Sequence, residues 1–197
     1  MPCDQALETF TEKATHGCVH VSGARFVLRK KPSGKLLSKT AHAVEREYRI
    51  LKALGDHTDV PVPRVFGLCL DVDIIGTPFY LMEFLQGRVI TDPLMSNIPH
   101  SQRRQYWKAA VKVLVKLHNV DFNNIGLSDY GKSSGYYKRQ LKSLLRVTTA
   151  QARARSPRTG ESIGPLPYLS EILVWLDNNP CPDETTVIHG DFKLDNI

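Results

Sequence analysis

The C-terminal stretch VIHGDFKLDNI brings several polar side chains into a short segment after an apolar run. Asp191 and Asn196 lie five residues apart in this stretch, and Lys193 lies between them. Phosphoryl transfer needs a carboxylate to orient the attacking hydroxyl and oxygen ligands for the Mg²⁺ ion that bridges the nucleotide phosphates. An Asp and an Asn on one tight loop can supply both functions, and a lysine can reach the transferred phosphate as a point charge. The stretch therefore predicts a site of phosphoryl transfer.

The spacing of this Asp and this Asn is also that of the catalytic loop of protein kinases, HxDxxxxN. Gly190 allows the backbone to turn sharply between His189 and Asp191. We expect His189 to brace the loop, because Asp191 lies nearer the position of an acceptor hydroxyl. The alternative is a turn rich in Asp and Asn with solvated carboxylates, since an Asp and an Asn often occur at this spacing by chance.

An arginine upstream could supply the cation of a nucleotide site. Arg29 lies on a short apolar strand expected at 24–30, where the lysine of V-A-I-K lies in protein kinases. A cation at this position contacts the α- and β-phosphates of the nucleotide. The guanidinium is planar and longer than the ammonium group of lysine, but it keeps the positive charge.

A helix glutamate must hold such a cation in place, and the stretch VEREY offers two. Glu45 and Glu47 lie about 200° apart around a helix, so only one of them can face the strand. Periodicity alone does not choose between them. An ordinary solvated salt bridge is the alternative explanation for an Arg29–Glu pair.

The stretch FYLMEFLQG predicts an apolar strand that leads into a connecting segment. In a two-lobed kinase such a segment offers backbone groups to the edge of adenine. Glu83, Phe84 and Leu85 would form this hinge, and Met82 would line the pocket. The strand pattern alone favours the simpler alternative, a buried strand that binds no ligand.

The elements that would position these residues change in type near residue 87. A strand, a helix and two further strands form a compact α+β unit in the first part of the chain, and the remainder is mostly helical. We expect a small strand-rich nucleotide-binding lobe at 1–87, with its first 20 or so residues poorly defined, and a partial helical lobe at 88–197.

The expected elements of both lobes follow from periodicity and from capping and turn residues. A polar, basic stretch at 148–162 is expected to be a mobile loop. The strands are expected at 24–30, 65–72, 78–85 and 185–188, and the helices from the Thr40 cap to Leu54 before Gly55, from the Ser101 cap onwards, at 134–147, and around Leu169–Leu176.

Composition limits the class of protein. The chain has 197 residues, 42% hydrophobic and 23% charged, which is ordinary globular usage with enough apolar residues for a core. Its net charge of +6 suits an anionic ligand, although a solvated basic face is the favoured explanation. The four cysteines have no zinc-like spacing and are expected to be reduced, which favours an intracellular compartment. No apolar run suggests a transmembrane segment, no signal peptide is visible, and no nucleic-acid-binding signature is present.

With these residues considered together, the chain resembles the aminoglycoside phosphotransferase and choline kinase-like family, which has a protein-kinase-like two-lobe fold. More closely, it resembles the kinase-like domain at the N-terminus of acyl-CoA dehydrogenase family members 10 and 11. Four stretches carry this resemblance, and together they span most of residues 24–197. They are FVLRKKPSGKLLSKTAHAVEREYRILKAL, VPVPRVFGLCLDVDIIGTPFYLMEFLQGRV, LSDYGKSSGYYKRQ and VIHGDFKLDNI.

The resemblance implies ATP and Mg²⁺ as cofactors and the hydroxyl of a small molecule as the phosphate acceptor. Within the closer group that acceptor is similar to a hydroxylated acyl-CoA. The resemblance makes Asp191 the catalytic base, Asn196 a magnesium ligand, Arg29 the phosphate-binding cation with Glu47 as its partner, and 83–85 the adenine hinge. It also implies a fused acyl-CoA dehydrogenase domain in the full-length protein and a mitochondrial or peroxisomal location, without a clear targeting signal in this chain.

The chain departs from the family pattern in two places. The phosphate-covering loop before the VLR strand looks shortened and altered in THGCVHVSGARFVLR. The family also carries a second metal-binding Asp on a strand after the catalytic loop, and this chain ends at Ile197, so we expect a truncated C-terminal lobe. These departures leave an alternative function open, that of a non-catalytic pseudokinase remnant that binds nucleotide or a partner.

Overall fold

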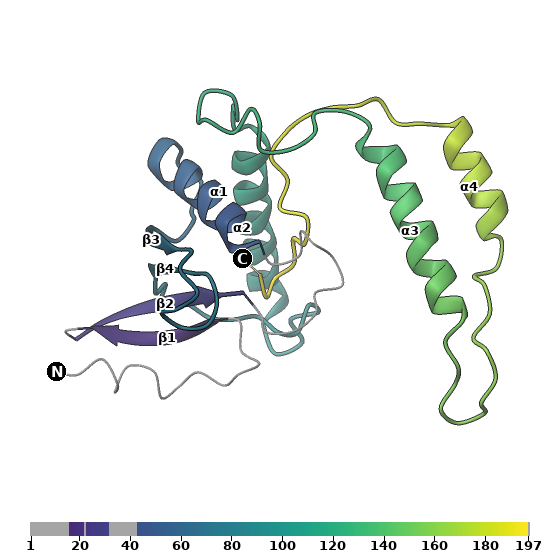
Figure 1. The fold of residues 1–197 in the computed structure, drawn as a ribbon, viewed down its shortest axis with the longest axis horizontal. Coiled ribbons are helices and arrows are strands. Elements are labelled where there is room, and N and C mark those ends of the chain that lie inside the picture. The colour runs from purple at the N-terminus through teal and green to yellow at the C-terminus, as the bar shows by residue number, and fades with distance from the viewer. Residues whose placement is uncertain (1–15, 22, 32–42, 197) are drawn as a thin grey trace. The chain divides into compact units, whose positions relative to one another are not determined.

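The computed structural model describes residues 16–21, 23–31 and 43–196 (Figure 1). The chain forms two compact units, one made of Met1–Leu127 with Thr186–Ile197 and the other of Ser128–Thr185. The first unit contains every strand of the described residues, together with helices α1 and α2. The lobe boundary expected at residue 87 rests on the change from strands to helices, and it stays a prediction.

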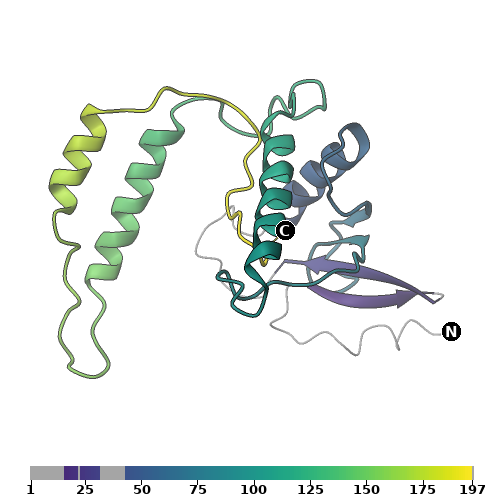
Figure 2. The same ribbon diagram turned by 180° about the vertical axis from the view of Figure 1, so that it is seen from behind.

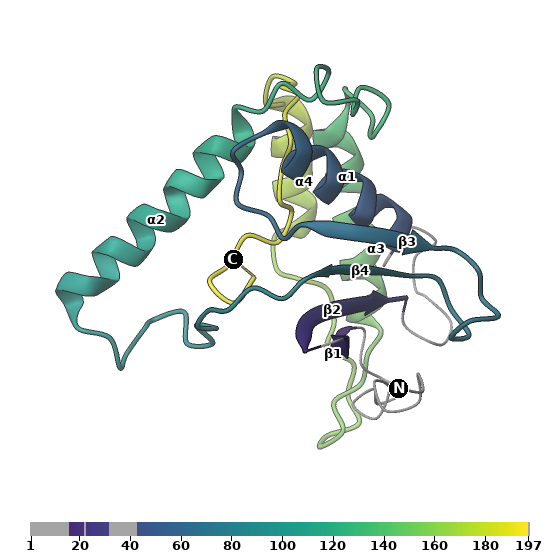
Figure 3. The ribbon, with the colours of Figure 1, turned by 90° about the vertical axis from the view of Figure 1, so that its left-hand side faces the viewer.

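The sheet of the first unit has four antiparallel strands in the order β1-β2-β4-β3 (Figure 3). A tight turn at Gly23, where φ is 81°, joins β1 to β2, and glycine adopts this backbone conformation without steric cost. Within the stretch that looks altered in sequence, residues 16–21 thus form a regular hairpin strand. The bounds are β1 His16–Val21, β2 Ala24–Lys30, β3 Val65–Cys69 and β4 Phe79–Glu83.

The register of β2 and β4 decides which side chains lie together on the sheet. Arg29 is paired with Tyr80, and Val27 is paired with Met82. Side chains alternate between the two faces of a strand, so these four share one face of the sheet. The strands predicted at 24–30, 65–72 and 78–85 are present, the last two as the shorter β3 and β4, and the α+β class is confirmed.

Helix α1, Val44–His57, follows the sheet's first hairpin along the chain. The predicted cap Thr40 lies outside the described residues, and the predicted end at Gly55 is wrong because the helix continues through this glycine. Thr58 ends it instead, since its backbone N–H and its hydroxyl both donate to the carbonyl of Leu54, at 3.0 and 2.6 Å.

Helix α2, His100–His118, packs its C-terminal end into the main apolar cluster of the first unit. The segment predicted as a strand at 185–188 is not a strand, because no strand of the described residues pairs with it. It is nonetheless fixed, since Val187 is buried and the Thr186 hydroxyl donates to the carbonyl of His118. The cluster consists of Leu54, Val60, Leu117 and Val187, with Ile50, Val62, Val120, Phe122 and Ile125 packed around it.

The second unit is a pair of helices, α3 Tyr136–Ala152 and α4 Leu169–Asn178, which lie side by side (Figures 1 and 2). The Tyr137 hydroxyl donates to the carbonyl of Leu176 at 2.9 Å and ties them together. Helix α3 extends five residues beyond its predicted end, so the predicted loop at 148–162 begins inside the helix. The remaining residues form a short turn closed by a bridge between Arg155 and Ser162.

Candidate active site

Arg29 and Glu47 form a two-point ion pair between β2 and α1. Arg29 Nε donates to Glu47 Oε2 at 2.9 Å, and Arg29 Nη2 donates to Glu47 Oε1 at 3.1 Å. The side chains are 20% and 33% exposed, so this pair is less solvated than an ordinary surface salt bridge. The hydrogen bonds that Arg29 donates to Glu47 raise the pKa of Arg29 and keep the guanidinium charged. The structure thus answers the choice between the two glutamates, since Glu45 is exposed and Glu47 faces the strand.

Tyr80 is a third member of this cluster that sequence reasoning missed. Its hydroxyl donates to Glu47 Oε2 at 3.3 Å, and the residue is only 3% exposed. Burial, and then the charge of Glu47, raises the pKa of Tyr80, so the phenol remains a proton donor at neutral pH. Alternation along FYLME places Tyr80 on the same face as Met82, and this pattern is the sequence signal that could have identified Tyr80. Only the register with β2 shows that this face also carries Arg29.

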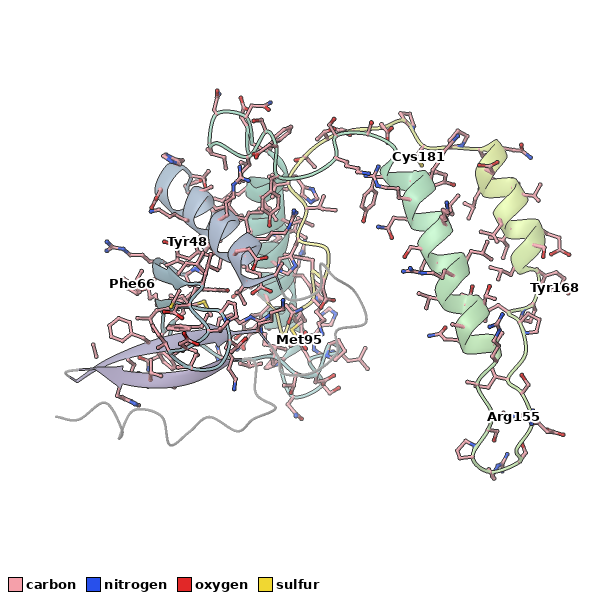
Figure 4. All side chains as sticks on the ribbon, in the orientation of Figure 1. Tyr48, Phe66, Met95, Arg155, Tyr168 and Cys181 are labelled. Carbon is pink, nitrogen blue, oxygen red and sulfur yellow. The ribbon has the colours of Figure 1, made fainter. Side chains whose placement is uncertain are left out.

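We expect Tyr80→Phe to lower the free energy of unfolding by about 1 kcal/mol, because Glu47 Oε2 loses one donor while the ring packing remains. Urea unfolding followed by circular dichroism measures this change. Tyr48→Phe is the matched control, since Tyr48 meets Tyr80 edge to face at 6.1 Å between ring centroids. Tyr48 is labelled in Figure 4. Equal stability of Tyr80→Phe and wild type would show that the hydroxyl does not hold Glu47.

The terminal loop closes on itself through Asp191 and Asn196. Asn196 Nδ2 donates to Asp191 Oδ2 at 2.7 Å and to the Asp191 carbonyl at 3.1 Å. The Asn196 N–H donates to the carbonyl of Lys193 at 2.9 Å, and Gly190 has a φ of 82° at the start of the turn. The spacing of five residues therefore brings the carboxylate and the amide into direct contact.

The terminal loop buries apolar side chains and leaves its charged side chains exposed to solvent. Val187 and Leu194 are 8% and 6% exposed and anchor the loop from both sides. The Asp191 side chain is 71% exposed and lies within reach of a ligand. Lys193 Nζ lies 3.7 Å from Asp191 Oδ2 and 3.3 Å from Asp195 Oδ2, in contacts that solvent weakens.

His189 contacts the backbone and a neighbouring ring within the same loop. Its Nδ1 accepts the N–H of Asp191 at 3.4 Å, and its ring meets Phe192 edge to face at 5.6 Å between centroids. Both contacts hold the start of the loop. The placement suits the bracing role expected for this histidine.

The predicted hinge begins at Glu83, the last residue of β4, and continues through the next two residues. The N–H of Glu83 donates to the carbonyl of Arg64 at 2.8 Å, and Glu83 Oε2 accepts the Arg64 N–H at 3.1 Å. The Arg25 guanidinium lies 4.2 Å from the centroid of the Phe84 ring, while Leu85 is 57% exposed. Figures 1 and 3 both show the terminal loop beside the segment that runs from β4 to α2. Binding of adenine by Met82 and residues 83–85 stays a prediction.

The loop residues suit a metal that takes most of its ligands from phosphates and water. No group of three or more His, Cys, Asp or Glu side chains within the described ranges could hold a metal ion by itself. Asn196 uses Nδ2 for Asp191, which leaves its amide oxygen as a potential ligand. Mg²⁺ commonly binds through one or two protein oxygens beside substrate phosphates, so a site of this size is compatible with it.

Comparison with known proteins identifies the family of the chain. Residues 17–197 match the model of the phosphotransferase enzyme family. The chain belongs to this family. A solved structure described as an aminoglycoside phosphotransferase, from Ralstonia eutropha JMP134, has a TM-score of 0.72 and 31% identity, and the match covers 98% of this chain and 56% of that one. The kinase-like fold expected from the sequence is therefore confirmed, and the family supports kinase-like phosphotransfer.

The curated relatives that match this chain are much longer proteins, and the match covers only a part of each. The probable acyl-CoA dehydrogenase IBR3 of Arabidopsis thaliana is 43% identical over 178 residues, which is 88% of this chain and 21% of that protein. Acyl-CoA dehydrogenase family member 10 of Mus musculus is 41% identical over 180 residues, 91% of this chain and 16% of that protein. The chain thus spans about a fifth of the length of the first relative and about a sixth of the length of the second. Across the described residues, no helix combines the length and apolar character that crossing a membrane requires.

Proposed function

We propose that the chain catalyses ATP-dependent phosphoryl transfer to the hydroxyl of a small molecule. The observation that carries the proposal is the closed turn in which Asn196 holds the carboxylate of Asp191 at 2.7 Å. This arrangement occurs in a chain of the phosphotransferase family with a kinase-like fold. It joins the two functions that phosphoryl transfer needs, a carboxylate for the acceptor and an oxygen ligand for a metal.

Asp191 orients the acceptor and accepts the proton of its hydroxyl as that oxygen attacks the γ-phosphorus of ATP, whose bond to the bridging oxygen breaks so that ADP leaves. Asn196 fixes the direction of this carboxylate and offers its amide oxygen to Mg²⁺. Lys193, on the same turn, places a positive charge beside the transferred phosphoryl group. Bound Mg²⁺ and ATP supply charge neutralisation and the phosphoryl group itself.

Arg29, in the cluster with Glu47 and Tyr80, binds the nucleotide phosphates. Glu47 keeps the Arg29 guanidinium in one orientation. The two-point geometry of the pair supports this role, because a planar guanidinium held through two nitrogens cannot rotate freely. Residues 83–85 and Met82 receive the adenine. Each of these assignments predicts a loss of nucleotide affinity on substitution.

The acceptor that we propose is a hydroxylated acyl-CoA. Two relatives are named acyl-CoA dehydrogenases and contain much more polypeptide than this chain matches, which supports a fused dehydrogenase domain in the full-length protein. Phosphorylation would prepare the hydroxylated acyl chain for breakdown by such a neighbour. A mitochondrial or peroxisomal location is part of the same proposal.

The test compares a hydroxylated acyl-CoA with the same acyl-CoA lacking the hydroxyl, in the presence of radiolabelled ATP and Mg²⁺. We expect label in the hydroxylated acyl-CoA alone, and its loss when EDTA removes the metal, because charge neutralisation on the phosphates is then absent. ATP binding that ignores Mg²⁺, with no labelled product from any hydroxyl compound, would instead favour a non-catalytic pseudokinase that binds nucleotide.

A further inference from the structure

A pocket of about 260 Å³ lies between the segment that follows β4 and the first turns of α2. This segment, which is the loop between β4 and α2, supplies most of the lining, and Tyr106 on α2 supplies the rest. Its lining is mostly apolar and includes Val89, Met95 and Ile98. Arg88 and Tyr106 bring the polar groups that the argument uses. None of the residues assigned above to phosphoryl transfer lines this pocket.

The apolar floor of the pocket is held in an unusual conformation. Met95 is 2% exposed and has a φ of 50°, in the left-handed region that residues with a side chain seldom adopt (Figure 4). Such a conformation costs free energy and persists only where surrounding contacts fix it. The Asp92 carboxylate provides those contacts, since it accepts the N–H groups of Leu94 at 2.9 Å and Ser96 at 2.6 Å.

Helix α2 holds the same loop from its other end. Arg103 Nε donates to the carbonyl of Ile98 at 2.8 Å, and Arg103 Nη2 donates to the carbonyl of Ser96 at 3.3 Å. The loop is therefore tied to Asp92 on one side and to Arg103 on the other. A pocket formed in this way exists before any ligand arrives, which lowers the entropic cost of binding.

The polar side of the pocket carries a positive charge. Arg88 Nη2 donates to the Tyr106 hydroxyl oxygen at 2.5 Å, and its guanidinium carbon lies 5.6 Å from the centroid of that ring. Within the part of the chain that the structure describes, Arg88 forms no ion pair. Because the Tyr106 oxygen accepts from Arg88, its own proton remains available to a ligand. The one acidic lining residue, Asp92, is engaged by backbone N–H groups, which lower its pKa.

We propose that this pocket binds an organic anion, with a carboxylate or phosphate on Arg88 and Tyr106 and a short apolar body over Met95 and Ile98. A guanidinium beside a hydroxyl donor matches the oxygens of either head group. The volume lies just below the range of drug-sized ligand pockets, so it suits a small molecule or one end of a larger one. This site does not depend on the phosphotransfer proposal.

The experiment uses three probes with one common chain: hexanoate, hexyl phosphate and the neutral control hexanol. The protein contains three methionines, Met1, Met82 and Met95, so ¹³C-methyl labelling gives one signal for the pocket and one for the predicted adenine site. We expect hexanoate or hexyl phosphate to shift the Met95 signal saturably, and hexanol to leave it unchanged at the same concentration. ATP with Mg²⁺ should shift the Met82 signal and not the Met95 signal. The anion-binding proposal and the nucleotide-binding proposal can therefore be refuted independently.

Two substitutions test the head-group contact. Arg88→Gln should weaken anion binding about tenfold or more because it removes the positive charge, and Tyr106→Phe by a smaller factor because it removes one neutral donor, while the apolar lining stays. Arg104→Gln is the matched control, since this exposed arginine on the same helix does not line the pocket. An unchanged Met82 signal shows that a variant is folded. Absence of any Met95 shift, or wild-type affinity in Arg88→Gln, would overturn the proposal.

Discussion

Asp191→Asn is expected to slow phosphoryl transfer by about 10²–10⁴-fold while ATP affinity stays within about twofold of wild type. The substitution keeps the shape of the side chain, and its amide oxygen can still accept from Asn196 Nδ2, which donates to Asp191 at 2.7 Å. It removes only the group that takes the proton of the acceptor hydroxyl. Initial rates at saturating ATP, together with the dissociation constant for ATP, separate the two effects.

Asp195→Asn is the control for the Asp191 experiment, because it makes the same chemical change in the same loop. The Asp195 carboxylate pairs with Lys193 at 3.3 Å in a partly exposed position, so we expect a rate within a few-fold of wild type. If Asp191→Asn keeps the wild-type rate, Asp191 is not the base. If both variants lose activity equally, the loop's net charge matters more than the identity of one carboxylate.

Local pattern was enough to predict most helices and strands of the fold. The alternation in ARFVLRK and FYLME identified β2 and β4, and the stripe that includes Val44 and Leu54 identified α1, with both residues buried. The errors fall where a tertiary contact decides a boundary. Helix α1 passes Gly55 because Thr58 caps it through Leu54, and 185–188 stays outside the sheet because its apolar side chain packs against helices.

The terminal loop and the Arg29–Glu47 cluster could be predicted only in part, because some of their contacts join residues that are far apart in the sequence. Within the terminal loop, five residues of spacing are local, so sequence alone placed Asp191 beside Asn196. Tyr80 lies 33 residues from Glu47, and their contact depends on the register of β4 with β2. The Arg88–Tyr106 pair spans 18 residues across an irregular loop. No periodic pattern connects such positions, so only the assembled fold shows them.

Leu54→Ala is expected to lower the free energy of unfolding of the first unit by about 2–5 kcal/mol. Leu54 is 4% exposed and packs with Val60, Leu117 and Val187, so the shorter side chain leaves a cavity. Leu70→Ala is the matched control, because Leu70 is 58% exposed and should change stability by less than about 0.5 kcal/mol. Urea unfolding followed by Trp107 fluorescence, in a Trp175→Phe background, reports on the first unit alone.

The Leu54 substitution also tests how one apolar cluster serves both halves of the site. Leu54 lies on α1, which carries Glu47, while Val187 in the same cluster lies four residues before Asp191. A cavity between them should loosen the Arg29 ion pair and the terminal loop together. Hydrogen exchange should therefore increase in α1 and at 187–196 alike. Faster exchange in α1 alone, with the loop unchanged, would mean that Asp191 is positioned by the anchor at Leu194 and not by this cluster.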